Sequence, residues 1–266
     1  MKTSIFAITL MALFTQDPTI KPISKSAGPW HKNSVIAHRG AWKKKNLPEN
    51  SIAALNEAIR LGCHGSEFDV HMTADSILVV NHDADFQGLH IAKLKYHDLL
   101  AKKLSNGENI PTLEEYLKAG LKQKKTKLIL EIKPSNVSPE WDSALADRSV
   151  ALVKKLKAQE WVDYISFGYD ILQRVLVQDP KARVAYLKGD VTLDQLKKDG
   201  FYGADYHYSV YKKGEWFDKA KNLGLTINAW TVNEQADMDL LIDSKIEFIT
   251  TNEPEQLLAL LKERKK

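Results

Sequence analysis

Residues 35–83 decide the fold, and they read VIAHRGAWKKKNLPENSIAALNEAIRLGCHGSEFDVHMTADSILVVNHD. A short apolar strand at 35–38 is followed by helix-period apolar positions at 52–59 and by a second strand at 65–71. A strand, a helix and a second strand form a βαβ unit, whose two strands pair in parallel. The stretch therefore predicts the beginning of an α/β fold.

The next apolar run, residues 77–81, follows the second strand after only five residues. This gap cannot hold a crossover connection, which takes about a dozen residues or more, so we expect the run to fold back antiparallel. The resulting hairpin arm returns His82 toward the ends of the first two strands. Residues 84–110 are mixed in character and are expected to form an excursion over the mouth of the fold.

The rest of the chain alternates strand and helix patterns. Without the hairpin arm, parallel strands are expected to begin near residues 35, 65, 127, 164, 183, 204, 225 and 247. Eight strand–helix units in 266 residues fit a TIM (β/α)8 barrel, which takes about 250 residues. We predict one barrel domain over residues 34–266, with a small hairpin insertion over its C-terminal mouth.

Acidic side chains on these strands indicate a metal site. Glu67 and Asp69 are spaced i, i+2 on one strand, so both point to the same face. Two neighbouring acids repel each other unless a cation lies between them. With Glu131 they offer three hard oxygen ligands, which suit one divalent metal ion, Mg²⁺ or Ca²⁺, rather than zinc. The alternative is that these acids bond the backbone or pair with Lys133.

The active site of a TIM barrel forms at the C-terminal ends of its strands. The side chains at or just past such ends include His38, Glu67, Asp69, Glu131, Lys133, Trp230 and Asn252. We therefore expect an active site there, with His38 and His82 as an acid–base pair. Arg39 and Lys133 are expected to hold a phosphate and to neutralise charge on its oxygens.

An ordered series of short motifs runs through residues 35–261. The series comprises His38-Arg39-Gly40, Pro48-Glu49-Asn50-Ser51, Glu67-Phe68-Asp69, His82-Asp83, Ile110-Pro111-Thr112-Leu113-Glu114, Glu131-Ile132-Lys133, Ser166-Phe167, Trp230-Thr231-Val232-Asn233 and Thr251-Asn252-Glu253-Pro254. Each motif alone is weak, but in this order they are specific. Together they resemble the glycerophosphodiester phosphodiesterase family.

The resemblance implies metal-dependent hydrolysis of glycerophosphodiesters to glycerol 3-phosphate and an alcohol. It implies Glu67, Asp69 and Glu131 as the ligands of a metal that binds the phosphate and the glycerol 2-hydroxyl. One histidine would deprotonate that hydroxyl for its attack on phosphorus, the other would protonate the departing alcohol, and water would then open the cyclic phosphate. We assign the first role to His38 and the second to His82, because the neighbouring carboxylate of Asp83 favours a protonated imidazole.

Further residues are expected around this centre. Trp230 is expected to wall the pocket against the carbon side of glycerol, with core packing as the alternative. A second layer of residues is expected to support the side chains that contact the metal or the substrate. These residues are Glu49, Asn50, His71 and Asn252. Asn252 stands where the family more often has aspartate. Residues 84–90 also depart from the family pattern, which leaves the preferred headgroup alcohol open.

Two other functions remain open from the sequence. One is a phospholipase-D-like lipid phosphodiesterase on the same type of barrel. The other is a catalytically silent protein that binds phosphodiesters, although the presence of both His38 and His82 argues against it.

Bulk composition is that of an ordinary globular protein, with 44% apolar and 27% charged residues. The net charge of +4 is spread over short lysine runs, without a basic stripe and interleaved aromatics. We therefore expect a small-molecule glycerophosphodiester as the partner and no nucleic acid. A single cysteine, Cys63, excludes a disulfide within the chain.

The N-terminus predicts export. Lys2 precedes the apolar run 5–14, which is shorter than the about 20 residues of a membrane span but suits the core of a secretory signal. We expect a signal peptide over residues 1–16, a flexible lead-in over 17–33, and a periplasmic or secreted protein without a membrane span in its mature form. An uncleaved membrane anchor is the alternative.

Overall fold

The computed structural model describes residues 28–212 and 216–265. The expected signal peptide, residues 1–16, lies outside the described residues, as do residues 17–27 of the expected lead-in. Across the two described ranges, no helix is both long enough and apolar enough to cross a membrane.

In the part of the chain that the structure describes, eight parallel strands form a closed barrel. In order around the ring they are β1 (Val35–Ala37), β2 (Gly65–Met72), β6 (Lys127–Ile132), β7 (Val162–Ser166), β8 (Val184–Tyr186), β9 (Gly203–His207), β10 (Thr226–Trp230) and β11 (Phe248–Thr251). Strand β1 closes the ring, because it pairs in parallel with both β2 and β11. The predicted TIM barrel is confirmed.

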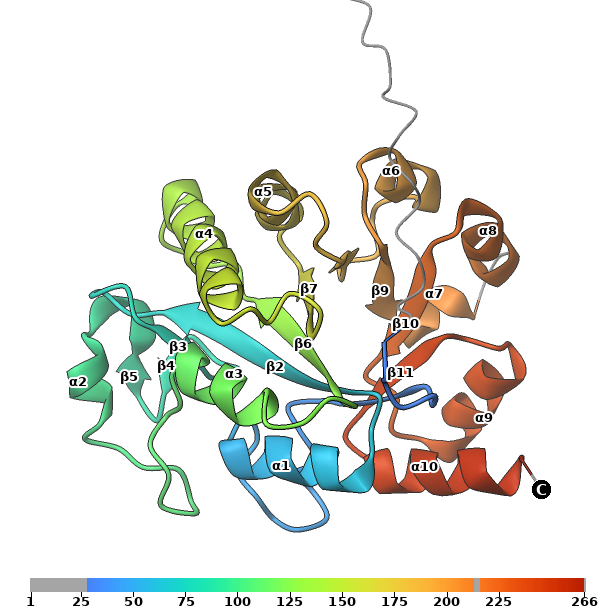
Figure 1. Ribbon diagram of the computed structural model, residues 1–266, viewed down its shortest axis with the longest axis horizontal. Helices are drawn as coiled ribbons and strands as arrows, with labels where there is room; N and C mark the ends of the chain where they lie inside the picture. Colours follow the sequence, from blue (N-terminus) through green and yellow to red (C-terminus); the bar gives the residue numbers. More distant parts are fainter. Residues whose placement is uncertain (1–27, 213–215, 266) are drawn as a thin grey trace, which may run out of the picture.

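Helices surround the barrel on its outside (Figure 1). They are α1 (Ile52–Leu61), α3 (Leu113–Gly120), α4 (Pro139–Lys155), α5 (Tyr169–Gln178), α6 (Leu193–Lys198), α7 (Tyr208–Tyr211), α8 (Trp216–Leu223), α9 (Gln235–Asp243) and α10 (Pro254–Glu263). Local sequence sets where they begin: the Ser51 hydroxyl accepts from the amide of Ala54, and Thr112 and Glu115 form a capping box. Each cap satisfies amides that the first helical turn leaves unpaired.

The hairpin arm is also confirmed. Strand β3 (Leu78–Val80) pairs antiparallel with the end of β2, with Val70 opposite Val80. The segment that follows contains β4 (Asp85–Phe86), β5 (Leu89–His90), the 3-10 helix η1 (Ile91–Lys93) and α2 (Tyr96–Leu99). This insertion lies beyond the C-terminal end of β2 (Figure 1). It has a small core of its own, formed by Val79, Phe86, Ile91, Leu99 and Ile110.

Packing against the barrel begins before residue 34, where the sequence predicts a flexible lead-in. Trp30 is only 8% exposed. Its ring meets that of Trp161 edge to face at 5.8 Å, and the ammonium of Lys127 lies 4.7 Å from its centroid. The amide of His31 donates to the carbonyl of Lys125 at 2.8 Å. These contacts tie residues 30 and 31 to the start of β6.

Candidate active site

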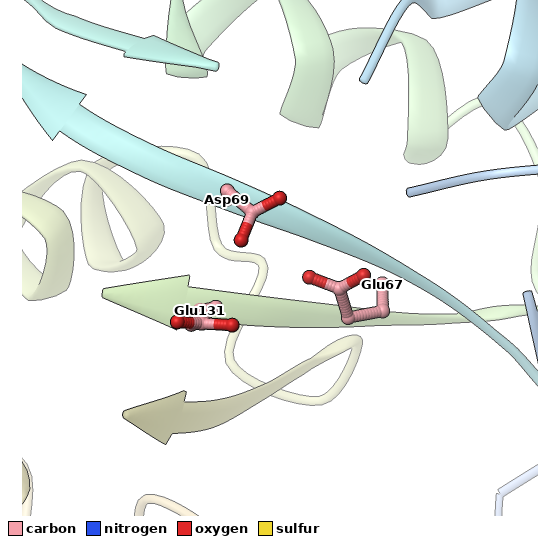
Figure 2. A group of neighbouring side chains, drawn as sticks. All are labelled: Glu67, Asp69 and Glu131. Atoms are coloured by element: carbon pink, nitrogen blue, oxygen red, sulfur yellow. The ribbon is translucent and has the colours of Figure 1, made fainter. Parts of the chain in front are cut away.

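Three carboxylates meet where β2 and β6 lie side by side (Figure 2). The parallel register of these strands places Asp69 opposite Glu131, and Glu67 lies one step earlier on the same face as Asp69. One oxygen from each carboxylate lies within 4.8 Å of the other two. All three side chains are buried. The sequence therefore correctly predicted which acids come together.

The partners of the carboxylates differ. One oxygen of Glu67, Oε2, accepts from the backbone amide of Arg39 at 2.8 Å. The side-chain amide of Asn50 donates to Asp69 at 2.8 Å, and its oxygen accepts from the backbone amide of Asp69. The ammonium of Lys133 lies 2.9 Å from Glu131 and 3.3 Å from Asp69. Asn50 and Lys133 thus hold the acidic group from two sides.

The three carboxyl groups differ in pKa. Burial, and then the charges of the other two acids, raise the pKa of Glu67 well above its ordinary value. Burial and the charge of Asp69 raise the pKa of Glu131 to about 8. Burial acts on Asp69 in the same direction, but Lys133, the neighbouring His82, the hydrogen bond from Asn50 and the charge of Arg39 together outweigh it, so the pKa of Asp69 is lowered. Without a further cation, the cluster therefore retains protons at neutral pH.

The donor set fits a hard divalent cation. Glu67 Oε1 is buried and has no hydrogen-bond partner, although a buried carboxylate oxygen normally accepts at least one bond. It belongs to a cluster of three carboxylates, which is the chemistry that Mg²⁺ and Ca²⁺ prefer. A metal ion bound there would supply the missing partner and relieve the repulsion.

The turn after β1 brings Arg39 into the site. Arg39 has a positive φ of 56°, an uncommon conformation for a residue with a side chain, and Gly40 follows with a φ of 83°. A Cβ on Gly40 would lie 2.7 Å from the backbone of Ala54, so this position has room only for glycine. The guanidinium of Arg39 bonds Glu49 at 2.8 Å and lies 3.8 Å from Asp69. Glu49 thus orients Arg39.

The side-chain amide of Asn252 fixes the orientation of the His38 imidazole. Its Nδ1 lies 2.8 Å from Oδ1 of Asn252, whose backbone amide donates to the side chain of Asn233. An amide oxygen can only accept, so Nδ1 carries the proton and Nε2 is left with a lone pair. Nε2 lies 3.9 Å from Glu67. Burial and the charge of Arg39 lower the pKa of His38 to about 4, so the imidazole is neutral at pH 7.

His82 arrives from the hairpin arm. Its Nδ1 lies 2.7 Å from the carboxylate of Asp83. Its backbone carbonyl accepts from Nε2 of His71 at 3.0 Å. His71 therefore positions the segment that carries His82, and it does so from the same strand that carries Glu67 and Asp69.

Aromatic side chains lie at or just past the ends of β7, β9 and β10. The indole of Trp230 donates to the carbonyl of Asp205 at 2.8 Å, which fixes the ring. Its ring meets Phe167 at 5.4 Å and His207 at 5.3 Å, both edge to face. Sequence reasoning assigned no role to Phe167 or His207. Their position at or just past the ends of β7 and β9 was the signal that could have identified them.

Comparisons with known proteins agree with this geometry. A sequence model described as the glycerophosphoryl diester phosphodiesterase family matches residues 38–256. A solved glycerophosphodiester phosphodiesterase from Parabacteroides distasonis is 44% identical, with a TM-score of 0.85 over 89% of this chain and 100% of that one. A curated glycerophosphodiester phosphodiesterase from Caldanaerobacter subterraneus is 29% identical over 87% of this chain and 98% of its own.

A further solved structure shares the fold. It is an Oleispira antarctica phosphodiesterase in complex with the product sn-glycerol-3-phosphate. It is 23% identical, with a TM-score of 0.73 over 86% of this chain and 97% of that one.

The raised pKa of Glu131 predicts how metal-free stability depends on pH. Because the folded-state pKa of about 8 exceeds the ordinary 4.5, the protonated side chain favours folding below pH 4.5, and this contribution is lost as the pH rises through 8. Glu131→Gln avoids that loss. In urea titrations with chelator, its gain in unfolding free energy over the native chain should grow from about pH 5 to about pH 9.

The exposed Glu263 provides the control for this measurement, since Glu263→Gln should show no such trend. A gain for Glu131→Gln that stays constant over the whole pH range would contradict the assignment.

Proposed function

We propose that this chain, which belongs to the glycerophosphoryl diester phosphodiesterase family, hydrolyses its diesters with one divalent metal ion and two histidines. The chain is a glycerophosphodiester phosphodiesterase, and glycerol 3-phosphate and an alcohol are the expected products. The observation that carries the catalytic proposal is the buried cluster of Glu67, Asp69 and Glu131 at the barrel mouth, 3.9 Å from the imidazole of His38.

The three carboxylates are the proposed metal ligands. Mg²⁺ or Ca²⁺ held by Glu67, Asp69 and Glu131 would neutralise charge on the phosphate and favour ionisation of a hydroxyl close to it. Asn50 and Lys133 support this role, because each holds a ligand carboxylate in place by a hydrogen bond or an ion pair. The guanidinium of Arg39 and the ammonium of Lys133 are the proposed partners of the phosphate oxygens.

His38 is the proposed base. Asn252 holds the proton on Nδ1, so Nε2 can accept the proton of the glycerol 2-hydroxyl. The lowered pKa of His38 means that this nitrogen is already unprotonated at neutral pH. The hydroxyl oxygen then bonds phosphorus, and the bond from phosphorus to the alcohol oxygen breaks. Trp230 is the proposed wall for the glycerol carbons, since its ring is fixed by a hydrogen bond and two aromatic contacts.

His82 is the proposed acid. When it is protonated, its Nδ1–H donates to Asp83, and the proton on Nε2 remains available to the departing alcohol. Water opens the five-membered cyclic phosphate in the second half-reaction. His82 takes a proton from this water, and His38 returns its proton to the glycerol 2-oxygen. Both histidines thus recover their starting states, and glycerol 3-phosphate is released.

The metal proposal predicts loss of glycerol 3-phosphate release after chelation and recovery with Mg²⁺ or Ca²⁺. Added metal should also raise the midpoint of thermal unfolding, because it binds only the folded cluster. Glu67→Gln should fold but require more metal for both effects, whereas Glu263→Gln should behave like the native chain. Full activity after exhaustive chelation would rule out the metal role.

The division of labour between the histidines predicts a substrate-dependent defect. His82→Ala should lower hydrolysis of natural diesters by about 10²–10⁴-fold but largely spare a glycerophosphodiester with a nitrophenol leaving group, which departs without a proton. His38→Ala should reduce hydrolysis of both substrates alike, because each still needs an activated nucleophile. Rescue of His38→Ala and not His82→Ala by the nitrophenyl substrate would reverse the two roles.

Export is proposed from the N-terminal sequence, in which Lys2 precedes the apolar run 5–14. The prediction is that mass spectrometry of the native protein finds the first fourteen or more residues missing. An intact N-terminus on protein from the cytoplasmic fraction would contradict the proposal.

A further inference from the structure

A groove runs between the insertion and the loop that joins β6 to α4. One wall is formed by Ala84, His90 and Lys93 of the insertion, and the other by Val137 and Trp141. The buried side chain of Leu145 and the ring of His71 contribute to its lining. Its volume of ≈ 430 Å³ is in the range of small-molecule sites.

The groove lies next to the candidate active site. His71, which lines it, donates to the carbonyl of His82. Pro134, which also lines it, directly follows Lys133, the partner of Glu131 and Asp69. The groove therefore lies beside the segment that carries His82, the proposed proton donor to the leaving alcohol.

Trp230, the proposed wall for the glycerol carbons, lies away from the groove. Trp230 ends β10, which is on the opposite side of the ring from β6. A diester bound at the carboxylates, with its glycerol against Trp230, would thus direct its other substituent toward the groove.

The lining of the groove combines apolar surface with a single permanent charge. Val137 and Trp141 supply exposed or half-exposed carbon, and Val137 is 51% exposed. Lys93 is the one lysine or arginine in the lining, and no carboxylate lines it; Asp83 and Asp85, which flank Ala84, are not part of it. Nδ1 of His90 is buried without a hydrogen-bond partner. Such a lining favours binding of a neutral, hydroxylated alcohol and disfavours binding of a cationic alcohol.

We infer that this groove holds the alcohol half of the diester, and that Lys93 selects neutral or anionic alcohols, such as a polyol, over a quaternary ammonium alcohol. The inference rests on the proposed function, since it names the substrate class of that reaction. Trp141 would contact the carbons of the polyol. Lys93 would disfavour a positive charge on the alcohol through electrostatic repulsion.

The test compares two diesters in one assay of glycerol 3-phosphate release. Glycerophosphoinositol carries a neutral polyol, and glycerophosphocholine carries a quaternary ammonium. The native chain should favour the inositol diester in kcat/KM. Lys93→Glu should raise the choline-to-inositol ratio by about tenfold at low salt, with less effect at high salt.

A matched control separates this effect from the general charge of the insertion. Lys102 is exposed on the same insertion but does not line the groove, so Lys102→Glu should leave the ratio unchanged. Trp141→Ala should raise KM for the inositol diester more than it changes kcat, because it removes binding surface away from the reacting atoms.

The outcomes distinguish this inference from the proposed function. Suppose that the native chain releases glycerol 3-phosphate but Lys93→Glu changes the choline-to-inositol ratio no more than Lys102→Glu does. The selectivity inferred for the groove is then wrong, and the proposed reaction is unaffected. A KM for the inositol diester that is unchanged in Trp141→Ala would place the alcohol outside the groove. If the native chain releases no product from either diester with metal present, the proposed function fails and this inference fails with it.

Discussion

The repulsion among three buried carboxylates is the constraint around which the mouth of the barrel is built. Glu67, Asp69 and Glu131 cannot move apart, because β2 and β6 pair over six consecutive positions, from Gly65↔Lys127 to Val70↔Ile132. The surrounding groups offset the repulsion instead. A backbone amide reaches Glu67, an asparagine reaches Asp69, and Lys133 lies between Asp69 and Glu131. Oε1 of Glu67, which lacks a hydrogen-bond partner, is the reason to expect a cation there.

The hydrogen-bond partner of His38 also carries no charge. Its partner is the neutral amide of Asn252. An amide fixes the tautomer without adding a negative charge, so burial and Arg39 are free to lower the pKa of the imidazole. The imidazole of His38, the proposed base, is therefore unprotonated at neutral pH.

Much of this arrangement could be predicted from the sequence, because it depends on short-range rules. The five-residue gap before residue 77 allows only a hairpin, and the i, i+2 spacing of Glu67 and Asp69 dictates a shared face. Contacts between distant segments could not be predicted in the same way. Trp30 packs on Trp161, and His207 packs on Trp230, but neither pair shows any pattern in the sequence. Such pairings depend on how the ring closes, and no local periodicity encodes that.

The attachment of the insertion has one more consequence. His38 and the three carboxylates belong to the barrel, whereas His82 follows β3 and is carried by a segment with its own small core of Val79, Phe86, Ile91, Leu99 and Ile110. Small units of this kind open at a lower free energy than the domain to which they are attached. The insertion can therefore open and withdraw His82, the proposed acid, while the barrel keeps His38 and the acidic cluster. If His82 acts as proposed, heating would abolish activity before it unfolds the barrel, and cooling would restore activity without refolding of the barrel.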